Sequence, residues 1–472
     1  MSIFHYLFIA FEVVVLFNLL IGVHELGHFL AAKWRGLKIE RFAIWFGKPL
    51  WKRKIGGVEY ALGWIPAGGY VALPQMATME AIEGKSETPA ESLPNVSPLD
   101  KIIVAFAGPL FSFLLAVLFA CAVWQVGRPV LEADDSTTIG WVDPTGPAWA
   151  AGLRPGDKIL SIDGHAVHHF LSASQDSIKW QIITSEGTNI VIKYVRDGKT
   201  AMAYPVPYSP PTKWYERKSL RQISIAPQME ATIAEVASNS PAALAGLKPG
   251  DEIVAMNGER LYSFYPILDL QDSWSNSPAQ PVTLTVKRGD QQFNRTLVPT
   301  KPVQPPNSNP MLGILSWQLD TNVSLVYPTP IEQINTSVGQ IYSTLHAVLS
   351  RKSEIGVQQL GGAVMIARVY YNLFQDEDAW RRALWFSVIL NVNLALLNLL
   401  PLPVLDGGHI VLSLLEAIRR RPVSAKILNS VQTGFAAVLI AFMLYIAFFD
   451  TGDWVRSARA DRDVPLIFAP TK

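Results

Sequence analysis

The residues best suited to chemistry form one short motif, His24-Glu25-Leu26-Gly27-His28. Residues four apart share a face of a helix, so His24 and His28 can present two imidazoles to one metal ion. Glu25 stands beside them as a general base, the arrangement of H-E-x-x-H zinc hydrolases. The same letters also occur by chance in proteins without metal. Here they end a long apolar run, where ionisable residues are costly unless they have a function. We therefore predict one Zn²⁺ per chain and peptide hydrolysis at membrane depth.

A catalytic zinc site needs a third protein ligand and leaves one position for water. Asp406, in the sequence NLLPLPVLDGGH, is the best candidate because it follows another apolar stretch on the same expected side of the membrane. Irregular backbone at that depth is tolerated only inside protein or beside water. An aspartate before two glycines is also typical of a plain turn, and His409 is a rival ligand. Asn398 can donate hydrogen bonds to a substrate carbonyl or oxyanion, or can pack between helices.

Apolar stretches must position these residues. Hydrophobic residues make up 49% of the 472 and charged residues only 17%, which is below the quarter usual for soluble domains. A span needs about 20 mostly apolar residues. Four segments qualify, although the second, the fourth and, most readily, the asparagine-containing third can also be read as buried helices of a soluble protein. The expected spans are residues 1–32, 102–126, 383–410 and 431–450. The first leads straight into the histidine motif, so we expect it to be retained rather than cleaved.

Positive charge predicts the orientation. Lysines and arginines are dense between residues 33 and 54 and again between 419 and 426, and such flanks stay cytoplasmic. The active site is then near the cytoplasmic side, with residues 127–380 and both termini on the other side. The net charge of +1 gives no case for nucleic acid. The single cysteine, Cys121, excludes a disulfide framework.

The middle of the chain contains an internal repeat. Residues 146–164, GPAWAAGLRPGDKILSIDG, match residues 240–258, SPAALAGLKPGDEIVAMNG. Each copy predicts a short helix, a Pro-Gly-Asp turn, a strand and an Asx-Gly hairpin turn, with further strands at 190–195 and 282–286. The pattern resembles the PDZ domain in its bacterial form. We expect two such domains, at 127–226 and 227–315.

Three other segments have weaker signals. Residues 33–101 are expected to form a cytoplasmic loop with strands around 58–65, where Gly68 and Gly69 permit a tight turn or a close backbone approach. Residues 76–98 predict a polar loop. Residues 331–380, within an expected linker at 316–382, predict amphipathic helix, which lies either on the outer membrane surface or on the PDZ pair. We expect a basic loop at 411–430 and a tail at 451–472.

These motifs together resemble the site-2 protease family of intramembrane zinc proteases, the M50 metallopeptidases. HELGH and NLLPLPVLDGG are that family's two signatures, and FGKPL, PAGGYVAL and AGP at 107–109 extend the likeness over nearly the whole chain. Tandem PDZ domains are similar to the branch of regulators of sigma E protease. LGGAVMIA at 360–367 resembles that branch's LSGPIGIA, with Ser-Gly-Pro altered to Gly-Gly-Ala.

The resemblance implies a fold and a function. The fold is a polytopic α-helical membrane protein with four transmembrane helices, two mixed α/β PDZ domains outside the cytoplasm and a membrane-associated β-hairpin around 60–72, whose edge can hold an extended substrate. The enzyme sits in the lipid bilayer of the bacterial inner membrane and cuts single-span proteins already trimmed by another protease. Its substrates include an anti-sigma factor and signal-peptide remnants, and the PDZ pair acts as a size filter. The implied site residues are His24, His28 and Asp406 for zinc, Glu25 for catalysis, and Asn398, Gly68, Gly69 and Tyr70 for substrate.

Two other readings stay open. A catalytically inactive PDZ scaffold would bind envelope proteins, but the complete set of Glu25 and three ligands argues for an enzyme. A metal transporter is disfavoured because no inverted repeat of the spans is visible.

Overall fold

The computed structural model divides the chain into two compact units. It describes residues 3–76, 93–94, 96–171, 174–306, 308–319, 323–375, 378–421, 425–460 and 466–469. The first unit comprises Met1–Arg128, Val326–Ile341 and Leu360–Thr451, and the second comprises Pro129–Leu325, Tyr342–Gln359 and Gly452–Lys472. The polar loop expected at 76–98 lies almost entirely outside the described residues.

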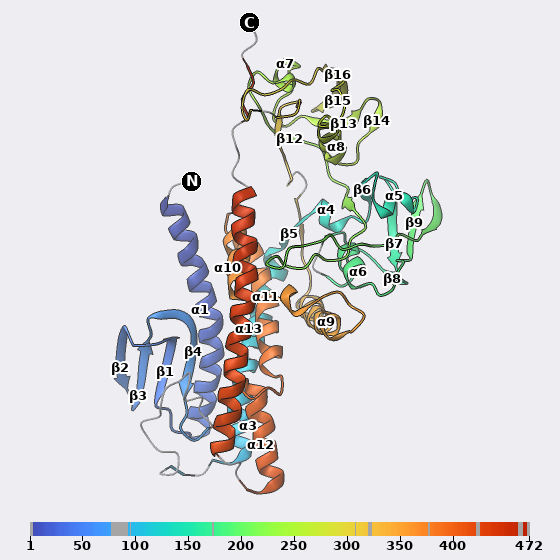
Figure 1. Cartoon of the computed structure of the whole chain (residues 1–472). Helices are drawn as coiled ribbons and strands as arrows, with labels where there is room; N and C mark the ends of the chain where they lie inside the picture. Colours follow the sequence, from blue (N-terminus) through green and yellow to red (C-terminus); the bar gives the residue numbers. More distant parts are fainter. Residues whose placement is uncertain are drawn as a thin grey trace. The chain divides into compact units, whose positions relative to one another are not determined.

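The first unit is built on three long apolar helices (Figure 1), α1 (Ile3–Trp34), α3 (Pro98–Val126) and α13 (Ala425–Ala460). Each contains a stretch long and apolar enough to cross a membrane, namely Leu7–Trp34, Pro98–Val126 and Leu428–Ala458. They correspond to the first, second and fourth predicted spans. The start of α3 has a local cause: the Ser97 hydroxyl accepts a hydrogen bond from the amide of Asp100, and Pro98 occupies the first turn, where a missing N–H costs nothing.

The third predicted span differs from the structure. Residues 383–410 are not one helix but two, α11 (Ala379–Asn398) and α12 (Asp406–Arg419), with a break between them. Pro401 and Pro403 lie in the break, and neither can donate the backbone hydrogen bond that a continuous helix needs. The basic loop expected at 411–430 is also wrong, because α12 continues to Arg419 and α13 begins at Ala425. The tail predicted from residue 451 is helical as far as Ala460.

A four-stranded sheet follows α1 in the chain. Its strands are β1 (Arg41–Phe46), β2 (Trp51–Ile55), β3 (Val58–Leu62) and β4 (Ile65–Ala72), in the order β2-β3-β1-β4. The hairpin expected around 60–72 is therefore wrong: β3 pairs parallel and β4 antiparallel with β1, which lies between them. Gly63 permits this crossing, since a Cβ there would overlap the Phe46 carbonyl. Figure 1 shows β4, the edge strand, nearest to α1.

The second unit contains two modules of the same topology. In the first, β7 (Lys158–Ile162), β8 (His165–Ala166), β9 (Ile192–Arg196) and β10 (Lys199–Ala203) are ordered β10-β9-β7-β8. In the second, β13 (Glu252–Met256), β14 (Glu259–Arg260), β15 (Val282–Arg288) and β16 (Gln291–Leu297) repeat that order from the other end, β14-β13-β15-β16. Helix α5 (Pro147–Ala150) of the first module corresponds to α7 (Pro241–Leu244) of the second, and α6 (Ile178–Thr184) corresponds to α8 (Tyr265–Ser273). The predicted repeat of helix, strand and hairpin is confirmed.

Each module has its own apolar core and the same internal ion pair. The aspartate of each Pro-Gly-Asp turn is buried and meets an arginine at the end of the third strand, Asp157 with Arg196 and Asp251 with Arg288. In both pairs the guanidinium donates two hydrogen bonds of 2.6 and 2.7 Å. The repeated sequence thus encodes a repeated fold, including one ion pair between a buried aspartate and a partly exposed arginine.

The segment 331–380 is helical, as expected, in α9 (Pro330–Leu349) and α10 (Ala363–Leu373), with a single 3-10 turn, η2 (Val357–Gln359), between them. The end of α9 and the residues after it pack on the first module, where Ala347 and Ile355 are buried with Ile183 of α6. Packing on a module, one of the two predicted alternatives, is therefore correct for this end of α9.

Candidate metal centre

The histidine motif lies where α1 packs tightly against α3. Gly27 permits the approach, because a Cβ at this position would overlap the backbone carbonyl of Ala107. Gly108 on α3 makes room for a ligand in the same way, since its Cβ would occupy the position of the His28 imidazole. The glycine inside HELGH and the glycine of AGP therefore have one purpose, which is to seat the histidine face of α1 against α3.

The far nitrogen of each imidazole is held by α3. His28 Nδ1 lies 2.8 Å from the carbonyl oxygen of Val104, and a carbonyl can only accept, so Nδ1 carries the proton. His24 Nδ1 lies 3.0 Å from the hydroxyl of Ser112, which is fully buried. Such contacts fix the tautomer and orientation of metal-binding histidines. In His28 they leave Nε2 with a free lone pair.

The third residue comes from the break between α11 and α12. Asp406 is the first residue of α12, and Gly407 and Gly408 follow it. A Cβ on Gly407 would overlap the carbonyls of Leu399 and Leu400, and one on Gly408 the carbonyl of Leu402. The two glycines thus let the start of α12 fold tightly against the preceding turn, and this fold aims the Asp406 carboxylate at α1.

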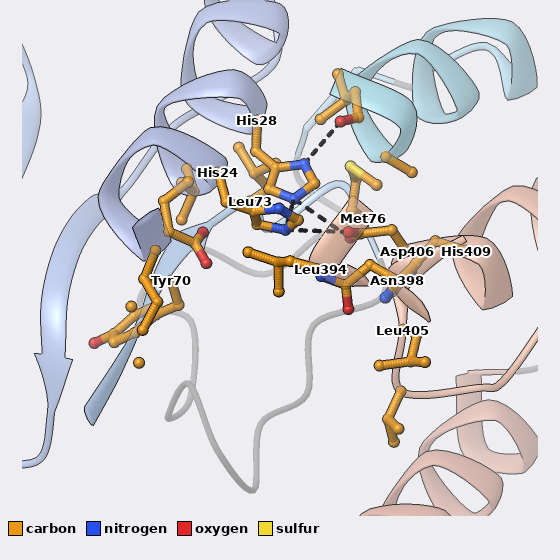
Figure 2. A pocket seen from close by; sticks show the side chains of 18 residues that line it. His24, His28, Tyr70, Leu73, Met76, Leu394, Asn398, Leu405, Asp406 and His409 are labelled. Atoms are coloured by element: carbon orange, nitrogen blue, oxygen red, sulfur yellow. Dashed lines mark hydrogen bonds and ion pairs between the residues drawn. The ribbon is translucent and has the colours of Figure 1, made fainter. Parts of the chain in front are cut away.

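Three ligand atoms converge at this point (Figure 2). The distance from His24 Nε2 to Asp406 Oδ2 is 3.2 Å, from His28 Nε2 to Asp406 Oδ1 3.3 Å, and between the two Nε2 atoms 3.2 Å. Zinc–ligand bonds of about 2.05 Å in a tetrahedron require ligand atoms roughly 3.3 Å apart. The 3.2 Å between the two Nε2 atoms matches the spacing of two ligands of one shared cation, and it is also the length of a hydrogen bond in which one imidazole donates to the other. Within the described part of the chain, these three residues form the one group with metal-ligand spacing.

The cluster opens on a cavity of about 270 Å³ in the first unit. Glu25 lies on its wall, half-buried, beside the edge strand β4. A Cβ on Gly69 would be 3.1 Å from Glu25 Cγ, so the β4 backbone runs directly against the glutamate side chain. All eight residues that the sequence singled out line this one cavity: His24, Glu25, His28, Gly68, Gly69, Tyr70, Asn398 and Asp406.

The predicted substrate residues contribute in different ways. Asn398 ends α11, lines the cavity and makes no side-chain hydrogen bond to the residues described, so its amide is available to a ligand. Tyr70 also lines the cavity, but its ring turns away from the histidines (Figure 2) and stacks on Phe46. His409 also lines the cavity but is outside the three-ligand cluster.

Sequence reasoning missed the α3 side of the site. Val104, Gly108 and Ser112 lie four residues apart on one face of α3, opposite the same spacing of His24 and His28 on α1. The small-residue motif AGP gave a signal for Gly108, although its purpose was not evident. A backbone carbonyl and a serine in an apolar helix gave none.

Comparisons with known proteins agree with this geometry. Residues 12–442 match the sequence model of peptidase family M50. Protease RseP of Yersinia pestis is 29% identical over 466 residues, which cover 93% of this chain and 96% of that protein. A protein of Neisseria meningitidis serogroup A named as a zinc metalloprotease is 30% identical, over 92% of this chain and 96% of its own. The regulator of sigma E protease of Haemophilus influenzae is 27% identical, over 93% and 97%.

Proposed function

The chain belongs to peptidase family M50 and is a membrane-bound zinc metalloendopeptidase, and from this premise we propose that it cuts other proteins within their transmembrane segments. One observation carries the proposal. Two of the three converging ligand atoms belong to α1, a membrane-length helix, and all three are spaced as a tetrahedral metal site requires. A protease of soluble substrates has no need of a metal site in such a helix, where each polar residue is costly.

We assign His24, His28 and Asp406 as the zinc ligands and Glu25 as the catalytic glutamate. A bound zinc ion supplies Lewis acidity, which polarises the substrate carbonyl and lowers the pKa of water to about 7. Glu25 accepts the proton of the attacking water and returns it to the leaving amide nitrogen. Asn398, with its amide free in the cavity, donates a hydrogen bond to the carbonyl oxygen as negative charge develops there.

The edge strand gives the substrate its conformation. A transmembrane helix hides its carbonyls in i to i−4 hydrogen bonds, so it must unwind before it can be cut. Strand β4 pairs with β1 on one side only, and Gly68 and Gly69 bring its backbone to the cavity wall. An extended substrate that adds to this edge regains the hydrogen bonds lost on unwinding. Tyr70 takes part through its main chain.

The rest of the architecture follows the family resemblance. We assign α11 as a fourth span, since Asn398 at its end lines the same cavity as His24 and His28 of α1. The two modules are PDZ domains that exclude bulky proteins outside the cytoplasm, and the basic flanks keep the active site near the cytoplasmic face of a bacterial inner membrane. The names of the relatives point to the sigma E pathway, so an anti-sigma factor and signal-peptide remnants are the substrates we propose.

Replacing Glu25 with Gln tests the function. Wild-type and Glu25→Gln protein are mixed in detergent with a truncated single-span anti-sigma factor, and both zinc content and cleavage are measured. We expect the variant to keep stoichiometric zinc, because its ligands are unchanged, and to lose cleavage. A variant that cut as fast as wild type would overturn the role of Glu25. If the inactive Glu25→Gln variant fully rescued a deletion strain, the alternative function as a catalytically inactive PDZ scaffold would be favoured instead.

A further inference from the structure

One side chain of the first module is exposed without a reason in the fold. Trp214 has 86% of its surface exposed, the largest value among the large apolar side chains described. It sits in a turn closed by the hydrogen bond from the Glu216 amide to the Lys213 carbonyl, and the Glu216 carboxylate accepts from the Lys213 amide at 3.0 Å. The turn is therefore ordered. It presents its indole to the surroundings instead of burying the 150–250 Å² that an aromatic side chain normally buries.

The chemistry of this turn is that of a membrane interface. Tyr215 contacts Trp214 edge to face, with ring centroids 5.5 Å apart, and Lys213 lies over the Tyr215 ring. Lys218, close behind, is exposed. Trp and Tyr concentrate at the level of lipid headgroups because one end of each ring is apolar and the other polar, and nearby lysines meet the phosphates.

The turn is tied to the end of a membrane-length helix. Arg217 Nε donates to Asp453 Oδ2 at 2.8 Å, and Asp453 also accepts from Arg456 at 2.5 Å. Asp453 belongs to α13 and lies near the end of the stretch Leu428–Ala458 that can cross a membrane. The next residue, Trp454, is 42% exposed. The ion pair therefore holds this turn beside the last turns of α13.

From these contacts we propose that the turn Lys213–Glu216 is a lipid anchor, with Trp214 inserted among the headgroups of the leaflet where α13 ends. The proposal depends on the membrane spans and not on the catalytic assignment. A protein partner is the competing occupant, but the combination of an exposed tryptophan, a tyrosine and adjacent lysines in the turn is the composition that favours a lipid interface.

The test uses the full-length protein in lipid nanodiscs. In a Cys121→Ser background, Thr212→Cys carries an environment-sensitive fluorophore beside an intact Trp214, and a second protein carries it at Thr200→Cys, an exposed position of β10. We expect nitroxide attached to the lipid headgroups to quench the label at 212 severalfold more strongly than the label at 200. Adding Trp214→Ser should weaken the quenching at 212.

Each result decides the question. Equal quenching at 212 and 200, or quenching at 212 that is unchanged by Trp214→Ser, would overturn the anchor. Reduced quenching after Trp214→Ser, with zinc content and cleavage of a model span retained, would establish it independently of the catalytic proposal. If Thr212→Cys does not fold, the label can be placed at Pro211, which is exposed on the same turn.

Discussion

The replacement of Gly108 by Ala separates helix stability from metal binding. By intrinsic propensity alone, alanine inside a helix is more stable than glycine by about 1 kcal/mol. At this position, however, the new Cβ would lie 2.8 Å from Cδ2 of His28 and closer still to Cε1 and Nε2. Atoms in ordinary contact are about 3.5 Å apart, so the imidazole must retreat by roughly 0.7 Å or more. We expect a stable protein with a damaged metal centre.

The size of the effect follows from the tolerance of zinc coordination. Zinc–ligand distances hold to within about 0.2 Å, and loss of a group that orients a ligand costs about 10- to 100-fold in metal affinity or activity. The shift of His28 is larger than that tolerance, and it also strains the hydrogen bond from Nδ1 to the Val104 carbonyl. Gly108→Ala should therefore lose zinc to a chelator at a concentration at least tenfold lower than wild type and cut a model span correspondingly more slowly.

Gly22→Ala is the matched control. Gly22 lies on α1 two residues before His24, and a Cβ added there meets no atom within 4 Å. This variant should keep wild-type zinc affinity. Chelator titration followed by metal analysis measures the affinities, and thermal unfolding checks the fold of both variants. The reasoning fails if Gly108→Ala holds zinc as tightly as Gly22→Ala, because the ring would then have room that the structure denies it.

Three further outcomes are expected. Asp406→Ala should abolish zinc binding while His409→Ala retains one zinc per chain, as metal analysis of the two purified proteins would reveal. Removing zinc with a chelator should stop cleavage and lower the melting temperature, and adding zinc should restore both, since a ligand that binds only the folded state stabilises it. Asp251→Asn should speed hydrogen exchange in β13, because it breaks the ion pair between the buried Asp251 carboxylate and the partly exposed Arg288 guanidinium. Burial raises the pKa of Asp251, but the hydrogen bonds from Arg288 outweigh this effect, so the net pKa is lowered. The stability of wild type relative to Asp251→Asn should therefore be retained above about pH 4 and be lost as the pH falls below it.

The sequence predicts the proposed ligands from two kinds of signal. Helical spacing alone pairs His24 with His28, whereas Asp406 is found from its place after an apolar stretch on the same expected side of the membrane, so the second inference already needs the membrane topology. The partner face of α3 could not be found in this way. Val104 acts through its carbonyl and Gly108 through the absence of a side chain, and neither property distinguishes these residues from others in an apolar helix.

The sheet shows a second limit. Alternation around residues 58–65 predicts strands correctly, but strand order depends on pairings between distant residues. Two strands separated by Gly63 and Trp64 suggest a hairpin, whereas β1 lies between them. The single span predicted at 383–410 was wrong for a related reason. Pro401 and Pro403 indicate a break, but the start of the next helix depends on how Gly407 and Gly408 pack on the preceding carbonyls.

Glycines at two places, Gly68–Gly69 and Gly407–Gly408, let main chain rather than side chains form the walls of the pocket. Gly407 and Gly408 fold one main chain against another, and Gly69 brings β4 against Glu25. Backbone N–H and C=O groups that face lipid without partners are costly, so the free edge of β4 must face water in the cavity or another extended chain. A helical segment offers no backbone hydrogen bonds to such an edge, whereas an unwound segment offers one N–H and one C=O at every second residue. If substrates add to this edge as we propose, the edge rejects intact helices and favours unwound ones, so the walls of the site would themselves select substrates by conformation.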